Sequence, residues 1–87
     1  MRDVMQKSIY SREYRLFLRH LRKARERANL TQAELARKLG CTQSFISKCE
    51  RGERRVDFIE LRAFCRAMKL DVDVFVQQLK EALHESV

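Results

Sequence analysis

The chain has 87 residues, enough for one small hydrophobic core and too few for a second domain. Its apolar residues occur in runs of at most three, such as 74–76, which excludes a transmembrane segment of about twenty residues and predicts a soluble protein. Nineteen lysines and arginines against twelve acidic residues give a formal charge of +7, and a small domain this basic usually binds a polyanion.

The positive charge is concentrated in the first two thirds of the chain. Residues 1–29 carry nine basic and three acidic side chains, residues 30–56 carry six and three, and residues 57–87 carry four and six. A solvated helix surface explains any single run of charge, but this asymmetry favours nucleic acid as the polyanion. An anionic membrane is the alternative, and it is disfavoured because the basic stretch also carries the apolar side chains that a globular core needs.

The N-terminal part of the chain divides into an arm and a helix. We predict residues 1–10 as a polar N-terminal arm or extension and residues 11–87 as the domain itself. The arm lacks the continuous apolar stretch of a secretory signal, so we expect a cytoplasmic protein. From Ser11 to Ala28, apolar residues recur at steps of three and four, which predicts a helix that has Arg25 on its apolar stripe.

Two short helices follow, and each has a signal at its start. Thr31 and Glu34 have the spacing of a capping box, which predicts that the second helix begins here. Gly40 stands where a residue in the left-handed conformation would end this helix. Thr42 can cap a third helix over about residues 43–51.

The four-residue turn 39–42 between these helices is the signature of a helix-turn-helix, in which the second helix lies in the major groove of DNA. We therefore place the helix-turn-helix core at residues 31–52, where Gly52 closes the third helix. Any other residue would resist a positive φ at Gly40 by about 1 kcal/mol. The chain has no proline and no further glycine, so we expect its remainder to be helical as well.

Two more helices complete the prediction. A charged loop precedes Asp57, which can cap a fourth helix, and Asp71 can cap a fifth helix within residues 71–87. The residues expected to face the core are Phe58, Leu61, Phe64, Cys65 and Met68 in the fourth helix and Val72, Phe75, Val76, Leu79, Ala82 and Leu83 in the fifth. Val74 lies off this stripe. The fifth helix is therefore a candidate dimerisation surface, and packing within the chain is the alternative.

The sequence from Leu30 to Glu53 reads LTQAELARKLGCTQSFISKCERGE. It closely resembles the Xre family of phage-repressor-like (Cro/cI-type) helix-turn-helix domains, and the resemblance extends over residues 21–79. The matching elements are the Leu-Thr-Gln start, Leu35-Ala36, Gly40, Ile46-Ser47 and Glu50-x-Gly52. The resemblance implies an all-α, five-helix DNA-binding domain with its helix-turn-helix in the second and third helices. Cys49 departs from the family, where a branched aliphatic residue is usual, and we expect slightly looser packing there.

The residues expected to contact bases lie in the third helix. Gln43 can present both amide groups to N6 and N7 of an adenine, and the resemblance assigns it this role. Ser44 and Lys48 project from the same side and are the next candidates, with the lysine suited to guanine or, alternatively, to phosphate. Phe45 either packs under the helix or contacts a thymine methyl group, and we expect it to be partly exposed. An isolated Gln, Ser or Lys is more often solvated surface, so these assignments depend on the motif.

The residues expected to contact phosphate surround this helix. They are Gln32, Thr42, Ser47, Arg51, Arg54 and Arg55. Gln32 opens the second helix, where free backbone amides attract a phosphate, and the resemblance implies that it also holds Gln43 in place. The loop that carries the three arginines runs beside the sugar-phosphate strand in resembling proteins. A solvated side chain is the alternative for one of these arginines.

The resemblance also pairs Arg25 with Glu50. It implies a partly buried salt bridge between the first helix and the third, and we expect both residues to be structural. A buried charge that loses its partner is costly, so removal of either side chain is expected to destabilise the fold.

No pattern in the chain indicates catalysis, a metal site or a cofactor. His20 and His84 lie far apart and are expected at the surface or at a helix end, and no glycine-rich phosphate loop occurs. The three cysteines are odd in number and form no C-x-x-C pair, which argues against a disulfide framework and a zinc cluster. We expect inert thiols, and a redox role for Cys41 in the turn is the alternative.

These observations predict a bacterial or phage transcriptional regulator that binds double-stranded DNA in a sequence-specific manner at the nucleoid. One helix contacts few base pairs, so we expect a homodimer that binds a palindromic operator through the major groove. The alternative function is an antitoxin or adaptor module that acts mainly through a protein partner. No association with a membrane is expected.

Overall fold

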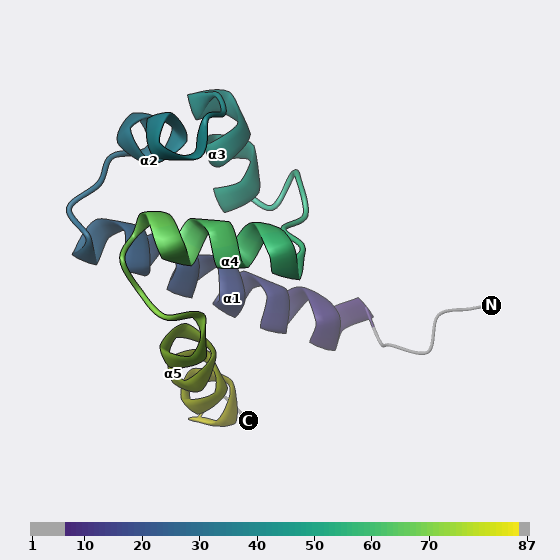
Figure 1. The fold of residues 1–87 in the computed structure, drawn as a ribbon. Helices are drawn as coiled ribbons and strands as arrows, with labels where there is room; N and C mark the ends of the chain where they lie inside the picture. The colour runs from purple at the N-terminus through teal and green to yellow at the C-terminus, as the bar shows by residue number, and fades with distance from the viewer. Residues whose placement is uncertain (1–6, 86–87) are drawn as a thin grey trace.

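The structure, a computed structural model, describes residues 7–85, with side chains described from Ser11 onward. It contains five helices and, within these residues, no strand (Figure 1). The helices are α1 (Lys7–Arg27), α2 (Gln32–Leu39), α3 (Gln43–Glu50), α4 (Phe58–Ala67) and α5 (Val72–Glu85). The predicted all-α fold of five helices is confirmed. None of these helices is both long and apolar enough to span a bilayer.

The first helix begins earlier than the predicted start near Ser11. α1 starts at Lys7, so residues 7–10, which we assigned to the N-terminal arm, continue the helix. They include neither proline nor glycine, so nothing in them stops a helix that the following residues stabilise. The rest of the predicted arm, residues 1–6, lies outside the described residues, as do residues 86–87. At the other end of α1, Asn29 takes a left-handed conformation (φ 60°).

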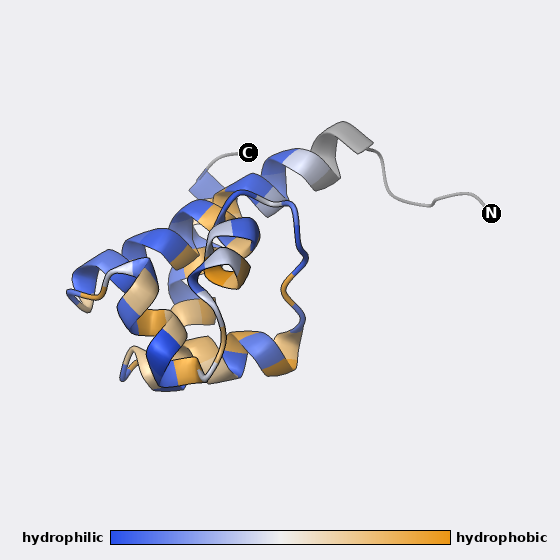
Figure 2. Ribbon diagram, turned by 90° about the horizontal axis from the view of Figure 1, so that it is seen from above, coloured by the Kyte–Doolittle hydropathy of each residue, from blue (hydrophilic) through white to orange (hydrophobic). Residues whose placement is uncertain are grey.

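The hydrophobic core lies between all five helices. α1 and α4 pass through the middle of the molecule, with α2 and α3 at one end and α5 at the other (Figure 1). Hydrophilic and hydrophobic residues alternate along each helix (Figure 2). The buried residues that form one continuous cluster are Leu21, Leu35, Ala36, Ile46, Cys49, Leu61, Phe64, Cys65, Met68 and Phe75. Within Val72–Glu85, Phe75 is the single buried residue.

Two residues that we placed on apolar stripes lie at the surface. Phe58 is 58% exposed and Val76 is 36% exposed. Phe58 is the first residue of α4, so no preceding helical turn covers it. Val76 directly follows Phe75, and successive residues of a helix point about 100° apart, so the narrow contact of α5 buries only one of the two. Val74 is 43% exposed, in agreement with its predicted place off the stripe.

His20 lies in the contact between α1 and α5, and the expectation that it lies at the surface or at a helix end is wrong. Its ring meets Phe75 edge-on with the ring centroids 5.4 Å apart. Its Nε2 atom is buried and has no hydrogen-bond partner among the described residues. Burial, helped by the nearby cations Arg27 and Lys23, lowers the pKa of His20 from its ordinary value of 6.5. The folded protein therefore favours the neutral imidazole.

The stability of the fold is expected to decrease below about pH 6.5, because the unfolded chain then binds a proton at His20 more readily than the folded chain does. His20→Phe removes this protonation and keeps an aromatic ring against Phe75. Its melting temperature should therefore fall less than that of the wild type between about pH 8 and about pH 5. Thermal unfolding followed by circular dichroism measures the difference. His84→Gln, on the exposed end of α5, should follow the wild type, and a His20→Phe variant that also follows it would contradict the prediction.

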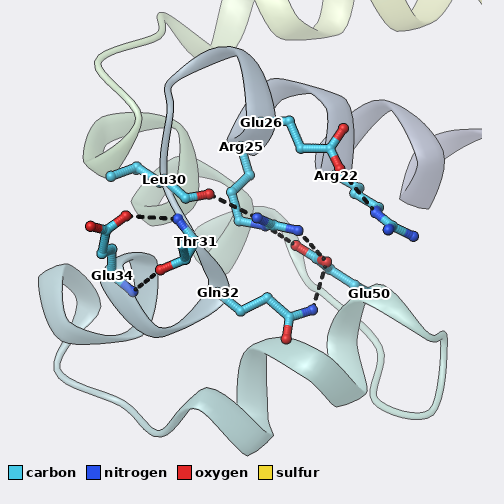
Figure 3. Close-up of polar contacts among 8 residues, drawn as sticks. All are labelled: Arg22, Arg25, Glu26, Leu30, Thr31, Gln32, Glu34 and Glu50. Atoms are coloured by element: carbon cyan, nitrogen blue, oxygen red, sulfur yellow. Dashed lines mark hydrogen bonds and ion pairs between the residues drawn. The ribbon is translucent and has the colours of Figure 1, made fainter.

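An ion pair shielded from solvent joins α1 to α3 (Figure 3). Arg25 Nε donates to Glu50 Oε2 at 2.7 Å and Nη2 donates to Oε1 at 3.1 Å, so the two groups meet through two parallel contacts. Arg25 Nη1 also donates to the backbone oxygen of Leu30 at 2.8 Å, and Gln32 Nε2 donates to Glu50 Oε1 at 2.9 Å. The hydrogen bond with Glu50 raises the pKa of Arg25 despite its burial. This network fixes α1, the start of α2 and the end of α3 relative to one another.

Glu50→Gln is expected to lower the free energy of unfolding by about 3 to 5 kcal/mol, because it leaves the guanidinium of Arg25 buried without its opposite charge. The side chains of this pair are only 10% and 5% exposed. The control is Glu26→Gln, which breaks the Arg22–Glu26 pair on α1, where the side chains are 64% and 53% exposed and the effect should be about 0 to 1 kcal/mol. Denaturant unfolding gives both values. Equal stability of the two variants would show that the buried pair does not hold these helices together.

Candidate nucleic-acid interface

α2, the turn that follows it and α3 form one continuous unit at an end of the molecule (Figure 1). Thr31 Oγ1 accepts a hydrogen bond from Glu34 N at 3.0 Å, and Glu34 Oε1 accepts one from Thr31 N at 2.8 Å, which is the predicted capping box. Gly40 ends α2, and Thr42 Oγ1 caps α3 by accepting a hydrogen bond from Phe45 N at 3.1 Å. The order helix, turn and helix is therefore present as predicted.

The two glycines both take the left-handed conformation, but for different reasons. At Gly40 (φ 73°) a Cβ atom would stand in open space, so only the backbone conformation requires glycine. At Gly52 (φ 82°) a Cβ atom would also come within 3.2 Å of Leu18 Cδ1. Gly52 therefore lets the chain pass close to α1 as it leaves α3. The third helix ends at Glu50, one residue before its predicted end, with Arg51 as its cap.

α3 presents polar side chains to solvent and apolar side chains to the core. Ile46 and Cys49 are fully buried, whereas Gln43, Ser44 and Lys48 are exposed. The residues that we expect to form hydrogen bonds with bases thus lie on the outward side of one short helix. An α-helix with its side chains is about 10 to 12 Å in diameter, which is close to the width of the major groove.

The polar residues expected at phosphate already have partners within the chain. The amide of Gln32 donates to Glu50, whereas the resemblance placed it on the first base-contacting glutamine. Thr42 Oγ1 is the cap of α3, and Ser47 Oγ accepts a hydrogen bond from Arg51 Nη1. A phosphate that binds these side chains must therefore share or displace an intramolecular contact.

Two arginines of the loop after α3 are paired with carboxylates. Arg51 Nε lies 2.9 Å from Glu53 Oε2, and Arg54 Nη2 lies 2.7 Å from Glu60 Oε2. Hydrogen bonds within each pair lower the pKa of Glu53 and Glu60 and raise the pKa of both arginines. The pairs are open to solvent, so they orient the guanidinium groups more than they stabilise the fold.

Tyr14 of α1 holds the far end of this loop. The guanidinium carbon of Arg55 lies 4.5 Å from the centre of the Tyr14 ring, within the range of a cation–π contact. The Tyr14 hydroxyl oxygen accepts a hydrogen bond from Val56 N at 3.1 Å. The loop is thus attached to α1 at Tyr14 as well as at Gly52, and its path beside α3 is defined.

Sequence reasoning missed one contact of this surface. The guanidinium carbon of Arg54 lies 4.9 Å from the centre of the Phe45 ring, and Phe45 is partly buried. Helical periodicity assigns a residue to a face of its own helix, but it does not say which residue of a following loop covers that face. The available signal was an aromatic residue at the third position of α3 and arginines in the loop that follows.

The three cysteines are free thiols, and Cys49 and Cys65 are buried. Burial raises the pKa of Cys41 and of Cys49, and it raises the pKa of Cys65 to about 11. A redox role for Cys41 would require a lowered pKa, so this direction disfavours it. In the part of the chain that the structure describes, no group of three or more His, Cys, Asp or Glu side chains could hold a metal ion.

Comparison with known proteins links this geometry to a family. A family model described as a helix-turn-helix domain matches residues 16–77, which include α2, the turn and α3. A solved structure titled "XRE-family like protein from Pseudomonas syringae pv. tomato str. DC3000" is 42% identical to this chain and superposes with a TM-score of 0.81. The match covers 87% of this chain and 93% of that chain. A search of curated proteins gave no match.

Proposed function

Because this chain belongs to the Xre family of helix-turn-helix DNA-binding domains, we propose that it is a transcriptional regulator that binds double-stranded DNA sequence-specifically through α3. The observation that carries this proposal is the outward side of α3, where Gln43, Ser44 and Lys48 are exposed and Ile46 beneath them is buried. A helix held in this way can enter the major groove without rearrangement of the core. We assign the protein no catalytic activity and place it at the nucleoid in the cytoplasm.

In this proposal, different side chains of α3 contact different bases. Gln43 makes a bidentate contact with N6 and N7 of an adenine, and Lys48 donates to the acceptors of a guanine. Ser44 is short and contacts either base. Discrimination therefore depends mainly on Gln43 and Lys48.

Phosphate contacts surround these residues and set the position of α3 on the duplex. We propose that they come from Gln32, Thr42, Ser47, Arg51 and Arg55, together with the free backbone amides at the start of α2. The carboxylate partner of Arg51 is exposed, so a phosphate can replace it. Arg54 lies in the same loop, but Glu60 already occupies its terminal nitrogens, and we do not count it among the phosphate contacts.

Gln43→Ala and Arg55→Ala are expected to weaken DNA binding in different ways. Loss of Gln43 should cost about 1 to 3 kcal/mol on the preferred sequence and broaden the preference, because base contacts discriminate. Loss of Arg55 should weaken binding to all duplexes alike and reduce the slope of log affinity against log salt by about 0.9, because one phosphate contact is lost. Fluorescence anisotropy at several salt concentrations, with a duplex selected from a random pool and with an unrelated duplex, measures both effects.

The matched controls are Lys23→Ala in α1 and Arg66→Ala in α4, two exposed positions outside both the proposed DNA contacts and the proposed dimer contact on α5. Neither control should change affinity or preference. Identical effects of Gln43→Ala and Arg55→Ala would contradict the division into base and phosphate contacts. A wild-type affinity that does not change with salt would contradict direct DNA binding.

We propose further that the protein binds DNA as a homodimer. α3 has eight residues and reaches few base pairs, whereas a two-fold dimer places two such helices about 34 Å apart on a palindromic site. Val74 of α5 is exposed and lies off the stripe that packs against the core, and an exposed large apolar side chain of this kind can mark an interaction site. We therefore place the dimer contact on α5.

Val74→Lys is expected to convert the dimer to a monomer, because it puts two unpaired charges into the contact. The wild-type mass at concentrations of tens of micromolar, measured by sedimentation equilibrium, should be twice that of one chain. Ile59→Lys is the control, since Ile59 is exposed at the start of α4 and should leave the dimer intact. A monomeric wild type would contradict this part of the proposal.

A protein partner is the second candidate, with the chain acting as an antitoxin or adaptor. Phe58 and Ile59 are adjacent large apolar residues that are 58% and 68% exposed, and a contiguous exposed apolar surface can mark a site for a protein partner. Phe58 lines the edge of a groove between α1, α4 and α5, together with Tyr14, Phe17, Leu61, Leu79 and Leu83. An adaptor predicts that affinity for DNA alone is weak and insensitive to salt, so the salt series above separates the two functions.

A further inference from the structure

We propose that Arg54 positions the ring of Phe45 to contact the 5-methyl group of a pyrimidine in the major groove. Phe45 then determines specificity for a pyrimidine that carries a 5-methyl group, which is present in both thymine and 5-methylcytosine. The inference rests on the proposed binding of α3 to DNA and adds the chemistry of one position. It also gives Arg54 a role other than phosphate contact.

Phe45 lies at the boundary between the core and the outward side of α3. It is the third residue of the helix, between exposed Ser44 and buried Ile46. One part of its ring packs against the core, and another part is open to solvent. A phenyl ring forms no hydrogen bond with a base edge, so a methyl group is the feature of the major groove that it can contact favourably. This contact discriminates well only if the ring is held in one orientation.

Arg54, in the loop after α3, holds the ring of Phe45 in this orientation. Its guanidinium carbon lies 4.9 Å from the centre of the Phe45 ring, within the range of a cation–π contact. Glu60 fixes the guanidinium in turn, because Nη1 donates to Oε1 at 2.8 Å and Nη2 lies 2.7 Å from Oε2. Two parallel contacts of this kind set the plane of the group as well as its position.

Glu60 is itself anchored at the first turn of α4. Its Oε1 atom accepts a hydrogen bond from Asp57 N at 2.9 Å, and its backbone N donates to Asp57 Oδ1 at 2.7 Å. A line of contacts therefore runs from this capping box through Glu60 and Arg54 to the ring of Phe45. The ring is ordered before DNA binds, so less side-chain freedom is lost on binding.

This geometry also favours a positioning role for Arg54 over a contact with phosphate. Both of its terminal nitrogens meet the carboxylate of Glu60, which offsets its charge. A lysine at this position keeps a positive charge for phosphate, but it neither makes two parallel contacts nor stacks as a plane on a ring. Arg54→Lys therefore distinguishes a positioning role from a phosphate contact.

The test uses the full chain and the duplex that it enriches from a random pool. Each thymine of this duplex is replaced singly by deoxyuridine, which removes only the methyl group, and each cytosine singly by 5-methylcytosine, which adds one. A loss of roughly fourfold in affinity at one thymine of each half-site identifies thymine as the contacted base, since this is the effect of withdrawing one methyl group from an apolar contact. A similar gain at one cytosine identifies 5-methylcytosine.

Variants then assign the effect to its residues. Phe45→Ala should abolish the methyl effect at that position. Arg54→Lys and Glu60→Gln should each reduce it below about twofold, because the ring is no longer held in place. Arg55→Ala is the matched loop variant, and it should weaken binding to every duplex while keeping the full ratio between methylated and unmethylated bases.

The inference is overturned if the wild type shows no methyl effect at any position, if Phe45→Ala keeps the effect, or if Arg54→Lys keeps its full size. Each result is a ratio between two duplexes for one protein, so a general loss of affinity does not obscure it. Failure of the wild type to enrich any sequence would overturn the proposed function as well. An enriched sequence without a methyl effect overturns this inference alone.

Discussion

The ion pair between Arg25 and Glu50 is the interaction on which the orientation of α3 depends. Apolar packing buries Ile46 and Cys49, but it has no preferred direction, so it constrains the rotation of a short helix only loosely. Two parallel contacts between a guanidinium and a carboxylate are directional. Gln32, at the start of α2, donates to the same carboxylate. The carboxylate of Glu50 therefore joins both helices of the helix-turn-helix, and this contact sets which side of α3 faces outward.

The features that could be predicted from the sequence are those set by residues close together in the chain. Thr31 with Glu34 and Asp57 with Glu60 form capping boxes within four residues, and Gly40 ends α2 through its own backbone conformation. These signals, together with Thr42 as the cap of α3, placed the starts of α2, α3 and α4 and the end of α2. The family resemblance supplied the partner of Arg25, which spacing alone would not have given, because the two residues are 25 positions apart.

The features that could not be predicted depend on which element packs beside a residue. α1 begins before Ser11 because no residue there interrupts it, and a missing stop signal leaves the start of a helix undefined. His20 packs against Phe75 although it was expected at the surface, and Phe58 is exposed although it was expected in the core, because burial depends on where α5 and the start of α4 lie. The contacts among Phe45, Arg54 and Glu60 join a helix, a loop and a second helix, and periodicity describes only one element at a time.

The single buried side chain of α5 has a consequence for the construction of the molecule. The ring of Phe75 contacts the rings of Phe17 and His20 of α1, while eight of the other nine members of the core cluster lie in the first four helices and the ninth, Met68, caps α4. Local stability follows the number of buried contacts, so the attachment of α5 depends mainly on this one aromatic side chain. Truncation of Phe75 would therefore remove the one fully buried anchor of α5 and leave the partly buried Val72 and Leu79 as its remaining contacts with the core.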